Sequence, residues 1–351
     1  MGPEWARLRC RERLLRICDV GLDHETLRLE LVEQLRGTIG FAMWGWPLAD
    51  PDTLLTTTGI ADPAAWAIVP RVVDYEQRTT DVIQDRQLAR SRDPVGILSV
   101  ATGGDLPRSR RWREIYDSYG VGDELRAACV DRYGCWAHLR FLRASDDPPF
   151  DAADAALLRD IVPAISSALR RRIVSPVENI QAGPAEPGIV VLDSQLAVRS
   201  WTPSAEAWFG WSVGRQPPTK TNMHCAVIST AARCLAADAP LAAARARLRL
   251  ADGRWVVAEA TRLQGADSGV AVSIRAATTN DVLGLLVRAY SLTPRERELV
   301  ALLADGLDTR QLSHRLCISR YTVQQHLKSV FGKVGVRSRR ELLTGVLAAH
   351  S

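Results

Sequence analysis

The sequence predicts an α+β protein with more than one domain: two segments that mix helices and strands, followed by an all-α segment of four short helices. Three observations lead to this fold class. The chain has 351 residues, more than one hydrophobic core usually holds. A stretch rich in proline and glycine separates the first two segments, and helix-start signals recur near the C-terminus. We therefore divide the chain into residues 1–173, a linker at 174–187, residues 188–276 and residues 281–351.

The composition indicates a folded, soluble protein. Hydrophobic residues make up 46% and charged residues 24% of the chain, close to the globular average. No apolar run reaches the ~20 residues that span a bilayer, and the first 16 residues alternate arginine with apolar residues, unlike a signal peptide. The seven cysteines form no Cys-x-x-Cys pair, which fits a reducing compartment. We expect a cytoplasmic protein without a membrane partner.

The basic residues exclude two classes of function and favour a third. Lysine occurs only at Lys220, Lys328 and Lys333, so no amine nucleophile and no lysine-dependent receiver domain precede residue 220. The chain also lacks the Gly-x4-Gly-Lys-Ser/Thr loop that holds nucleotide phosphates. The net charge is +5, and residues 291–351 hold ten basic and five acidic residues, so all the excess positive charge lies there. This distribution favours a C-terminal surface that binds phosphate.

The first segment combines helical and strand patterns. Helical spacing over residues 5–17 and 24–36 precedes strand-like runs at 39–46 and 96–101. A polar helix is expected at 110–119, paired strands at 125–130 and 135–142, and a closing helix at 151–172. Pro163 lies inside that last helix, which it is expected to bend without ending.

The second segment predicts a small antiparallel sheet. It opens with a strand at 188–193 and a helix at 203–209. Residues 246–250 alternate in polarity, Asp252 and Gly253 supply a turn, and residues 255–261 run back, which is the signature of a hairpin. A last strand is expected at 270–275. Five strands with helices on one face fit this length.

Four helices are expected in the third segment, at 294–304, 309–316, 320–334 and 339–349. Each begins after a residue that caps helix N-termini: Thr293, Asp308, Ser319 and Ser338. Glu or Gln follows three residues after the first, second and fourth, as in capping boxes, the second being the looser match. Gly306 and Gly335 are placed to end helices.

The spacing of the second and third helices is typical of a helix-turn-helix. Only three or four residues, 316–319, connect them. An apolar face of the third helix is expected to pack inward, whereas Gln324, Gln325 and Lys328 lie on the other face and suit a major groove, since Gln pairs with adenine and Lys reaches guanine or phosphate. The inward face consists of Val323, Leu327, Val330, Phe331 and Val334. The predicted DNA-contacting residues are Arg320, Tyr321, Thr322, Gln324, Gln325, Lys328, Lys333, Arg337, Arg339 and Arg340.

These residues also carry a family resemblance. Residues 291–346, with motifs at 292–298, 318–323 and 326–342, resemble the LuxR-type helix-turn-helix of bacterial transcription regulators. The resemblance implies a four-helix DNA-binding domain that usually dimerises through its last helix. Many members carry Thr-Val-Lys where this chain has Thr322, Val323 and Gln324, so their base preference does not transfer. The expected dimer contacts are Leu342, Leu343, Val346 and Leu347, unless these residues complete the core of their own domain.

The upstream segments resemble sensory modules. Residues 188–275 look like a PAS-type domain, and residues 20–172 are similar to GAF-like domains of actinobacterial regulators. Neither resemblance brings a catalytic residue. The tryptophans of the first segment fit either a deep core or an apolar ligand cavity: Trp44, Trp46, Trp66, Trp112 and Trp136.

Other candidate sites are weaker. His224, Cys225 and Cys234 lack a second pair with metal-ligand spacing. Cys135 and His138 are expected on opposite faces of a strand, too far apart for a nucleophile and its base. We therefore predict no catalytic residue, no metal and no cofactor, and leave open an unidentified small-molecule ligand.

These observations favour a one-component transcription regulator and not an enzyme. Its expected partners are double-stranded DNA and a second copy of the chain, with RNA polymerase as a further candidate. Two alternatives remain: a thiol-dependent enzyme with an accessory helix-turn-helix, and an interaction scaffold. A short helix at 281–290 is expected to dock on the sensory segments or on a dimer mate, or to pack only on its own DNA-binding domain.

Overall fold

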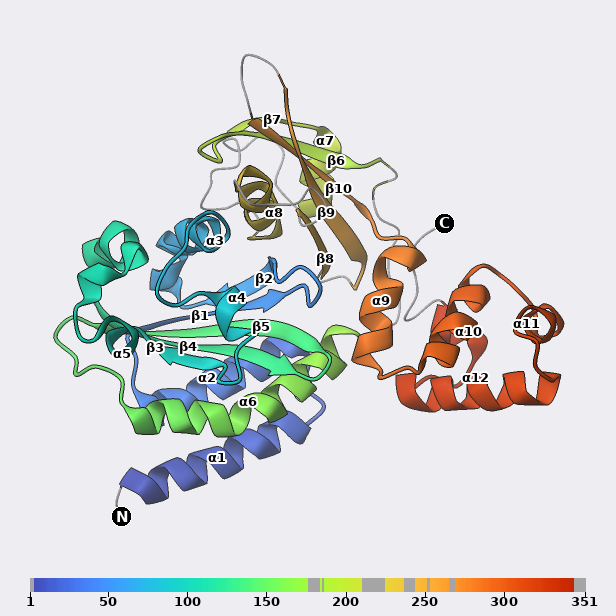
Figure 1. Cartoon of the computed structure of the whole chain (residues 1–351), viewed down its shortest axis with the longest axis horizontal. Helices are drawn as coiled ribbons and strands as arrows, with labels where there is room; N and C mark the ends of the chain where they lie inside the picture. Colours follow the sequence, from blue (N-terminus) through green and yellow to red (C-terminus); the bar gives the residue numbers. More distant parts are fainter. Residues whose placement is uncertain are drawn as a thin grey trace.

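The computed structural model describes residues 3–175, 184, 186–209, 225–236, 244–250, 253–264 and 269–343. Over these ranges the fold is a mixture of helices and strands with two antiparallel sheets and a helical C-terminal region, as the sequence predicts (Figure 1). The strand order is β2-β1-β5-β4-β3 in the first sheet and β7-β6-β10-β9-β8 in the second. The second sheet therefore repeats the topology of the first.

The first segment is a sheet between two helical layers. Its elements, in chain order, are α1 (Pro3–Asp19), α2 (His24–Ile39), β1 (Met43–Ala49), β2 (Thr56–Ala61), α3 (Val69–Arg78), α4 (Asp85–Leu88), β3 (Val95–Ile97), α5 (Leu98–Thr102), β4 (Val121–Asp131), β5 (Gly134–Ala144) and α6 (Ala152–Ile173). Asp23 caps α2 and Asp151 caps α6, and Pro163 lies inside α6 as predicted. Short 3-10 turns lie at Pro63–Ala67, Leu106–Arg108 and Asp117–Tyr119, with a π-helical turn at Trp112–Tyr116.

Two expectations for this segment need correction. The strand expected at 96–101 covers only Val95–Ile97, after which the chain turns into helix α5. The polar helix expected at 110–119 is a π-helical turn followed by a 3-10 turn. Strand β2 was not predicted, because it shows no alternation of apolar and polar residues. Helix α3 was missed although Val69, Val72 and Val73 follow helical spacing.

The two faces of the first sheet differ in polarity. Helices α2 and α6 cover one face, with α1 packed on their outer side (Figure 1), and the apolar core between them includes Trp46 and Trp136, each fully buried. On the other face Arg111 and Arg126 are buried with Glu76 and Glu124 in a network of ion pairs, with nitrogen–oxygen distances of 2.6–3.1 Å. Every hydrogen-bond donor of a buried arginine needs a partner, and the carboxylates of these ion pairs supply most of those partners.

The second segment contains the predicted hairpin. Its elements are β6 (Gly188–Asp193), β7 (Val198–Trp201), α7 (Pro203–Phe209), α8 (Cys225–Leu235), β8 (Arg245–Arg249), β9 (Trp255–Arg262) and β10 (Gly269–Ala276). The unpredicted helix α8 lies between the second sheet and the first segment, beside α3 (Figure 1). Its Ser229 hydroxyl accepts a hydrogen bond from the Thr56 amide of β2 at 3.0 Å, so α8 ties the two segments together.

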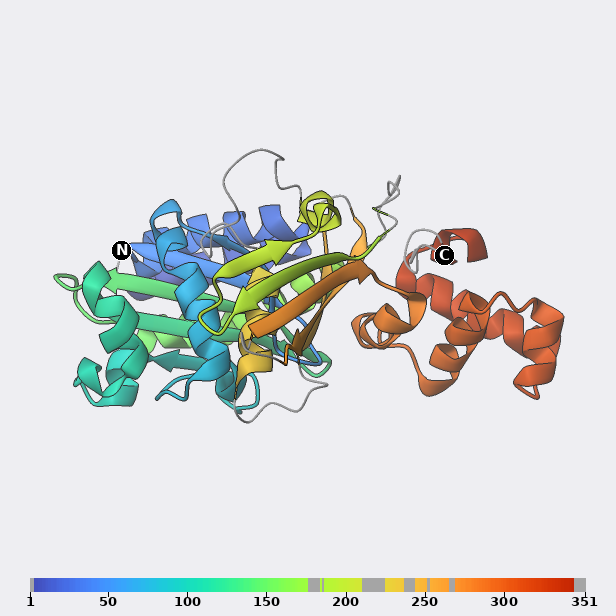
Figure 2. The same ribbon diagram turned by 90° about the horizontal axis from the view of Figure 1, so that it is seen from above.

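The C-terminal helices form a separate group at one end of the molecule (Figure 2). They are α9 (Thr279–Ala289), α10 (Pro294–Ala304), α11 (Thr309–Arg315), α12 (Arg320–Val334) and α13 (Arg339–Glu341). One buried apolar cluster runs from the first segment through α9 into this group. Among the described residues, no helix is both long enough and apolar enough to cross a membrane.

Candidate nucleic-acid interface

The helix-turn-helix is built by local caps, as the sequence predicts. Thr293 and Asp308 form capping boxes at the starts of α10 and α11, and the Ser319 hydroxyl accepts from the Thr322 amide at the start of α12. The turn between α11 and α12 places Cys317 at φ 52°, a left-handed conformation that favours glycine. Gly335 takes φ 79° just after α12. These contacts set the ends of α12 and hence which side chains it presents.

Helix α12 has one buried and one exposed face. Val323 and Val330 are fully buried against α10 and α11, and Leu327 and Val334 are nearly so. Tyr321, Gln324, Gln325 and Lys328 are exposed on the other side, with 73% of Tyr321 accessible. The amphipathic pattern read from the sequence is confirmed. The exposed face carries the groups that read base edges in a major groove.

The predicted residues at the helix ends differ in accessibility. Arg320, Arg337 and Arg340 are exposed, whereas Arg339 is half-buried. The Thr322 hydroxyl lies 2.8 Å from the Ser319 hydroxyl, so part of its hydrogen-bonding capacity serves the cap. Contact of the exposed arginines with DNA phosphates stays a prediction.

Lys333 has partners inside the domain. Its amine donates to the Glu296 carboxylate at 2.6 Å and to the Ser291 carbonyl at 3.3 Å. Burial alone would raise the pKa of Glu296, but hydrogen bonds from Lys333, Ser329 and Thr293 outweigh burial and lower the pKa to about 2. Lys333 therefore ties α12 to α10, and of the ten predicted contacts it has the strongest structural role.

The last predicted capping box is only half formed. The Ser338 hydroxyl accepts from the Glu341 amide at 3.1 Å, as expected. The Glu341 carboxylate accepts from the Arg337 amide at 2.8 Å and from the Ser338 hydroxyl, not from the Ser338 amide. The returning bond is thus made one residue earlier than a capping box requires.

The described residues cover half of the predicted dimer contacts. Leu342 is 1% exposed and belongs to the apolar cluster of its own domain, which is the alternative arrangement for this residue. Leu343 is partly buried against the same cluster. Val346 and Leu347 lie outside the described residues.

Helix α9 docks on both upstream segments. The Asp281 carboxylate at its start pairs with Arg245 of β8 and with Arg275 of β10, the latter at 2.6 Å. Near its end, Arg288 pairs with Asp52 of the first segment. The Tyr290 hydroxyl donates to the Val174 carbonyl, so the start of the predicted linker is held against α9.

An ion cluster joins the same three parts of the chain. Arg247 on β8 pairs with Asp50 at 2.6 Å and with Asp52, and it also donates to the Asp281 carbonyl of α9. Asp50 is 1% exposed. The sequence gives no sign of this cluster, because Arg247 and Asp50 are 197 residues apart and match no motif.

The first sheet and α3 line an apolar cavity of the kind that the tryptophan content suggested. Trp44 and Trp66 line it together with residues of α3 and with Cys225 of α8. Trp46 and Trp136 instead belong to the apolar core. The cavity contains no catalytic constellation.

The expected separation of Cys135 and His138 is wrong. A β-bulge at Trp136 adds one residue to β5, so both side chains face the same side, with Cys135 Sγ 3.8 Å from His138 Nε2. Burial raises the pKa of the Cys135 thiol well above its usual value and lowers the pKa of His138. Both groups are therefore neutral, and a neutral buried thiol is a poor nucleophile.

No cluster of metal-ligating side chains occurs within the described ranges. Cys225 and Cys234 are buried, and His224 lies outside those ranges.

Comparison with known proteins identifies the C-terminal region. Residues 290–345 match the family model of bacterial regulatory proteins, luxR family. A putative HTH-type transcriptional regulator of Mycobacterium tuberculosis is 45% identical over 53 residues, which are 15% of this chain and 6% of that protein. The probable transcriptional regulatory protein SgaR of Hyphomicrobium methylovorum is 53% identical over 49 residues, 14% of this chain and 23% of SgaR. The chain thus spans only a minor part of these relatives.

The solved structures include a distant likeness over nearly the whole chain. SdiA of Escherichia coli is 11% identical with a TM-score of 0.37, and the alignment covers 95% of this chain and 93% of SdiA. A likeness at this level carries no conclusion about this chain. What the comparisons show is a luxR-family helix-turn-helix domain at residues 290–345.

Proposed function

We propose that this chain, whose residues 290–345 form a luxR-family domain, is a one-component transcription regulator that binds double-stranded DNA. The observation that carries the proposal is the exposed polar face of α12, where Gln324, Gln325 and Lys328 lie side by side on a helix whose opposite face is buried. In this proposal α12 enters the major groove and the exposed Arg320 and Arg337 contact phosphates.

The charge distribution supports the same proposal. All ten predicted contacts lie within residues 291–351, the region that holds all the excess positive charge of the chain. A protein that neutralises phosphates releases condensed counterions, so its DNA affinity falls steeply with salt. The chain is expected to lose affinity for DNA markedly between low and moderate salt.

A gel-shift of the full chain on fragments of its own promoter tests the proposal. We expect retarded complexes. An excess of unrelated DNA should displace the chain from them only weakly. A chain that is folded by circular dichroism but retards no DNA at low salt would instead be the interaction scaffold considered above.

The upstream segments are proposed to be the sensory part of the regulator. Both sheets share one antiparallel order, which supports the resemblance of residues 1–173 to GAF-like and of residues 188–276 to PAS-like domains. We further propose a homodimer, because a single recognition helix reads too short a site for useful discrimination. RNA polymerase remains a candidate partner, and the cytoplasm is the proposed location.

A further inference from the structure

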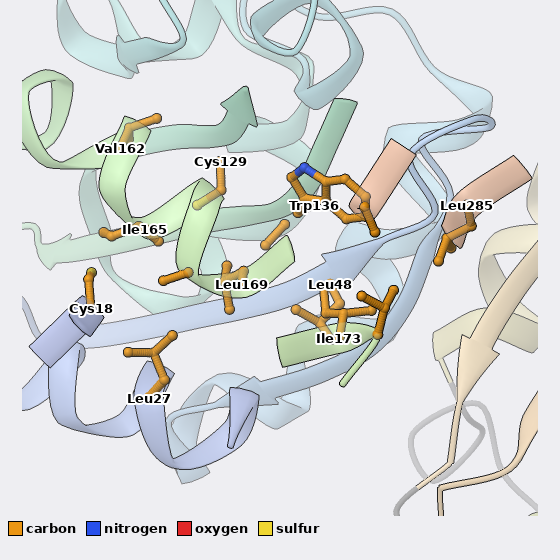
Figure 3. Packing of buried hydrophobic residues seen from close by; sticks show 14 of the residues in the cluster. Cys18, Leu27, Leu48, Cys129, Trp136, Val162, Ile165, Leu169, Ile173 and Leu285 are labelled. Atoms are coloured by element: carbon orange, nitrogen blue, oxygen red, sulfur yellow. The ribbon is translucent and has the colours of Figure 1, made fainter. Parts of the chain in front are cut away.

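Helix α9 extends the apolar core of the first segment toward the C-terminal helices. Leu285 of α9 lies at the edge of that core, beside Trp136 of β5 and Ile173 of α6 (Figure 3). Ile165 and Leu169, also drawn in Figure 3, place α6 along the same core. The packing of α6 and the docking of α9 therefore involve one continuous cluster of side chains.

Arg170, in the last turn of α6, contacts the end of α9. Its Nη1 donates to the carbonyl of Ala289, the last residue of α9, and its Nε pairs with the Asp131 carboxylate at 2.8 Å. The guanidinium carbon lies 4.4 Å from the centre of the Tyr133 ring. Because the carbonyl end of a helix carries partial negative charge, a cation is stabilising there. Arg170 thus joins α6, the β4–β5 hairpin and α9.

A second hydrogen bond joins the same two helices in the opposite direction. The Tyr290 hydroxyl, at the end of α9, donates to the Val174 carbonyl just beyond α6. Burial raises the pKa of Tyr290 well above its ordinary value, so the phenol keeps its hydrogen and remains a donor. The end of α6 therefore holds the end of α9 through two bonds.

The chain leaves α9 through a short hinge. Only residues 290–293 separate α9 from α10, and Ser291 takes φ 56°, in the left-handed region that favours glycine. The Ser291 carbonyl accepts from Lys333 of α12 at 3.3 Å, and Lys333 also pairs with Glu296 of α10. A strained backbone of this kind persists where its surroundings hold it. Residues 289–291 are thus held by Arg170 on one side and by Lys333 on the other.

We propose that Arg170 is a positioning residue that fixes the orientation of α12 relative to the first segment. A displacement of α6 reaches α12 through residues 289–291, because both helices hold the same three residues. A free connection of residues 290–293 would instead let the separation of its ends vary over roughly 10 Å. Only the consequence for DNA, a recognition helix presented in one orientation, rests on the proposed function.

Pulsed electron paramagnetic resonance on the full chain tests this joint by measuring a distance distribution. All seven cysteines lie in the described ranges and only Cys317 is exposed, so it takes one spin label. The second label is attached through Glu30→Cys on the exposed face of α2. We expect a narrow distribution with Arg170 intact and one at least about twofold broader in Arg170→Met, because the released connection varies over roughly 10 Å.

Two arginine substitutions serve as controls. Arg171→Met is the matched one, since Arg171 is exposed in the same turn of α6 and donates to the Ser167 hydroxyl of its own helix. Arg199→Met is the remote one, since Arg199 is exposed and pairs with Asp193 at the surface of the second segment. Both are expected to leave the distance distribution unchanged.

Arg170→Met leaves the Asp131 carboxylate without its ion-pair partner, so the substitution is also made together with Asp131→Asn, which removes that charge. Circular dichroism checks that each variant is folded. An unchanged distribution in the folded Arg170 variants, or equal broadening in Arg171→Met, would overturn the proposal.

DNA binding is measured separately by gel-shift. A distribution that broadens in Arg170→Met, in a chain that retards no DNA, would refute the proposed function and leave the joint intact. Retarded DNA with an unchanged distribution would do the reverse.

Discussion

The exposed side chains on α12 and just beyond it are predicted to form two groups, one that reads bases and one that contacts phosphates. Gln324 and Gln325 have no structural role in the described fold, since both are exposed on the face opposite Val323 and Leu327. Arg337 is exposed beyond the end of the helix. The two groups are expected to contribute differently to DNA affinity.

Alanine substitutions separate these roles. Gln324→Ala or Gln325→Ala is expected to cost roughly 1–3 kcal/mol on the preferred site and little on unrelated DNA, because a lost base contact affects only its own base pair. Arg337→Ala is expected to weaken binding to the preferred site and to unrelated DNA about equally. Fluorescence anisotropy on the two DNAs measures this, with Arg199→Ala as a control. A uniform loss in the glutamine variants would contradict base reading by α12.

Glu296 makes the stability of the C-terminal domain depend on pH. Its pKa is lowered to about 2 in the folded chain, below the ordinary value of 4.5. The ionised group therefore stabilises the fold above about pH 5, and this contribution disappears as the pH falls toward 2. Glu296→Gln is expected to be less stable at neutral pH and to lose less stability on acidification.

Urea unfolding at pH 7 and pH 3 measures that difference. Glu298→Gln is the matched control, because Glu298 is about half exposed and pairs with Arg295 at the surface. Such surface pairs contribute little. An identical pH dependence in the Glu296 and Glu298 variants would show that Glu296 is not responsible.

At the scale of elements, the ion cluster around Arg247 joins the first segment, β8 and α9. This side chain is 10% exposed, and Asp50 is 1% exposed. Truncating Arg247 leaves the Asp50 carboxylate buried without its main partner. Removing one member of a buried pair typically costs about 3–5 kcal/mol.

Arg247→Met is accordingly expected to lower the free energy of unfolding by about that amount, and Asp50→Asn in the same chain to recover part of the loss. Arg199→Met serves for comparison and is expected to cost less than about 1 kcal/mol. Thermal and urea unfolding are measured for the unmodified chain, Arg247→Met, Arg247→Met combined with Asp50→Asn, and Arg199→Met. If Arg247→Met lowered the free energy of unfolding no more than Arg199→Met does, water would replace Arg247 as the partner of Asp50 without cost.

At the scale of the whole molecule, the expected assembly is a dimer on DNA. Leu347→Arg is expected to weaken self-association and to lower affinity for a two-half-site operator far more than for a single half-site, since only the dimer gains from the second half-site. Sedimentation with and without DNA checks this. A folded variant that is still dimeric on the operator would exclude the last helix from the interface.

Much of the fold follows from local sequence because it depends on neighbouring residues. The caps at Thr293, Asp308 and Ser319 act within three residues, and a period of apolar side chains defines the buried face of α12. The hairpin of β8 and β9 and the uninterrupted course of α6 through Pro163 were predicted for the same reason.

Tertiary structure alone decided which residues far apart in the sequence are in contact. The pairing of Arg247 with Asp50 spans 197 residues, so no local pattern contains it. The bulge at Trp136 reverses the side on which Cys135 lies, since strand register is set by the partner strand. The sequence by itself determined the helix-turn-helix and its polar face, because caps and periodicity act locally. Packing decided how α9 connects that domain to the two upstream segments, because burial and ion pairing depend on residues brought together only by the fold.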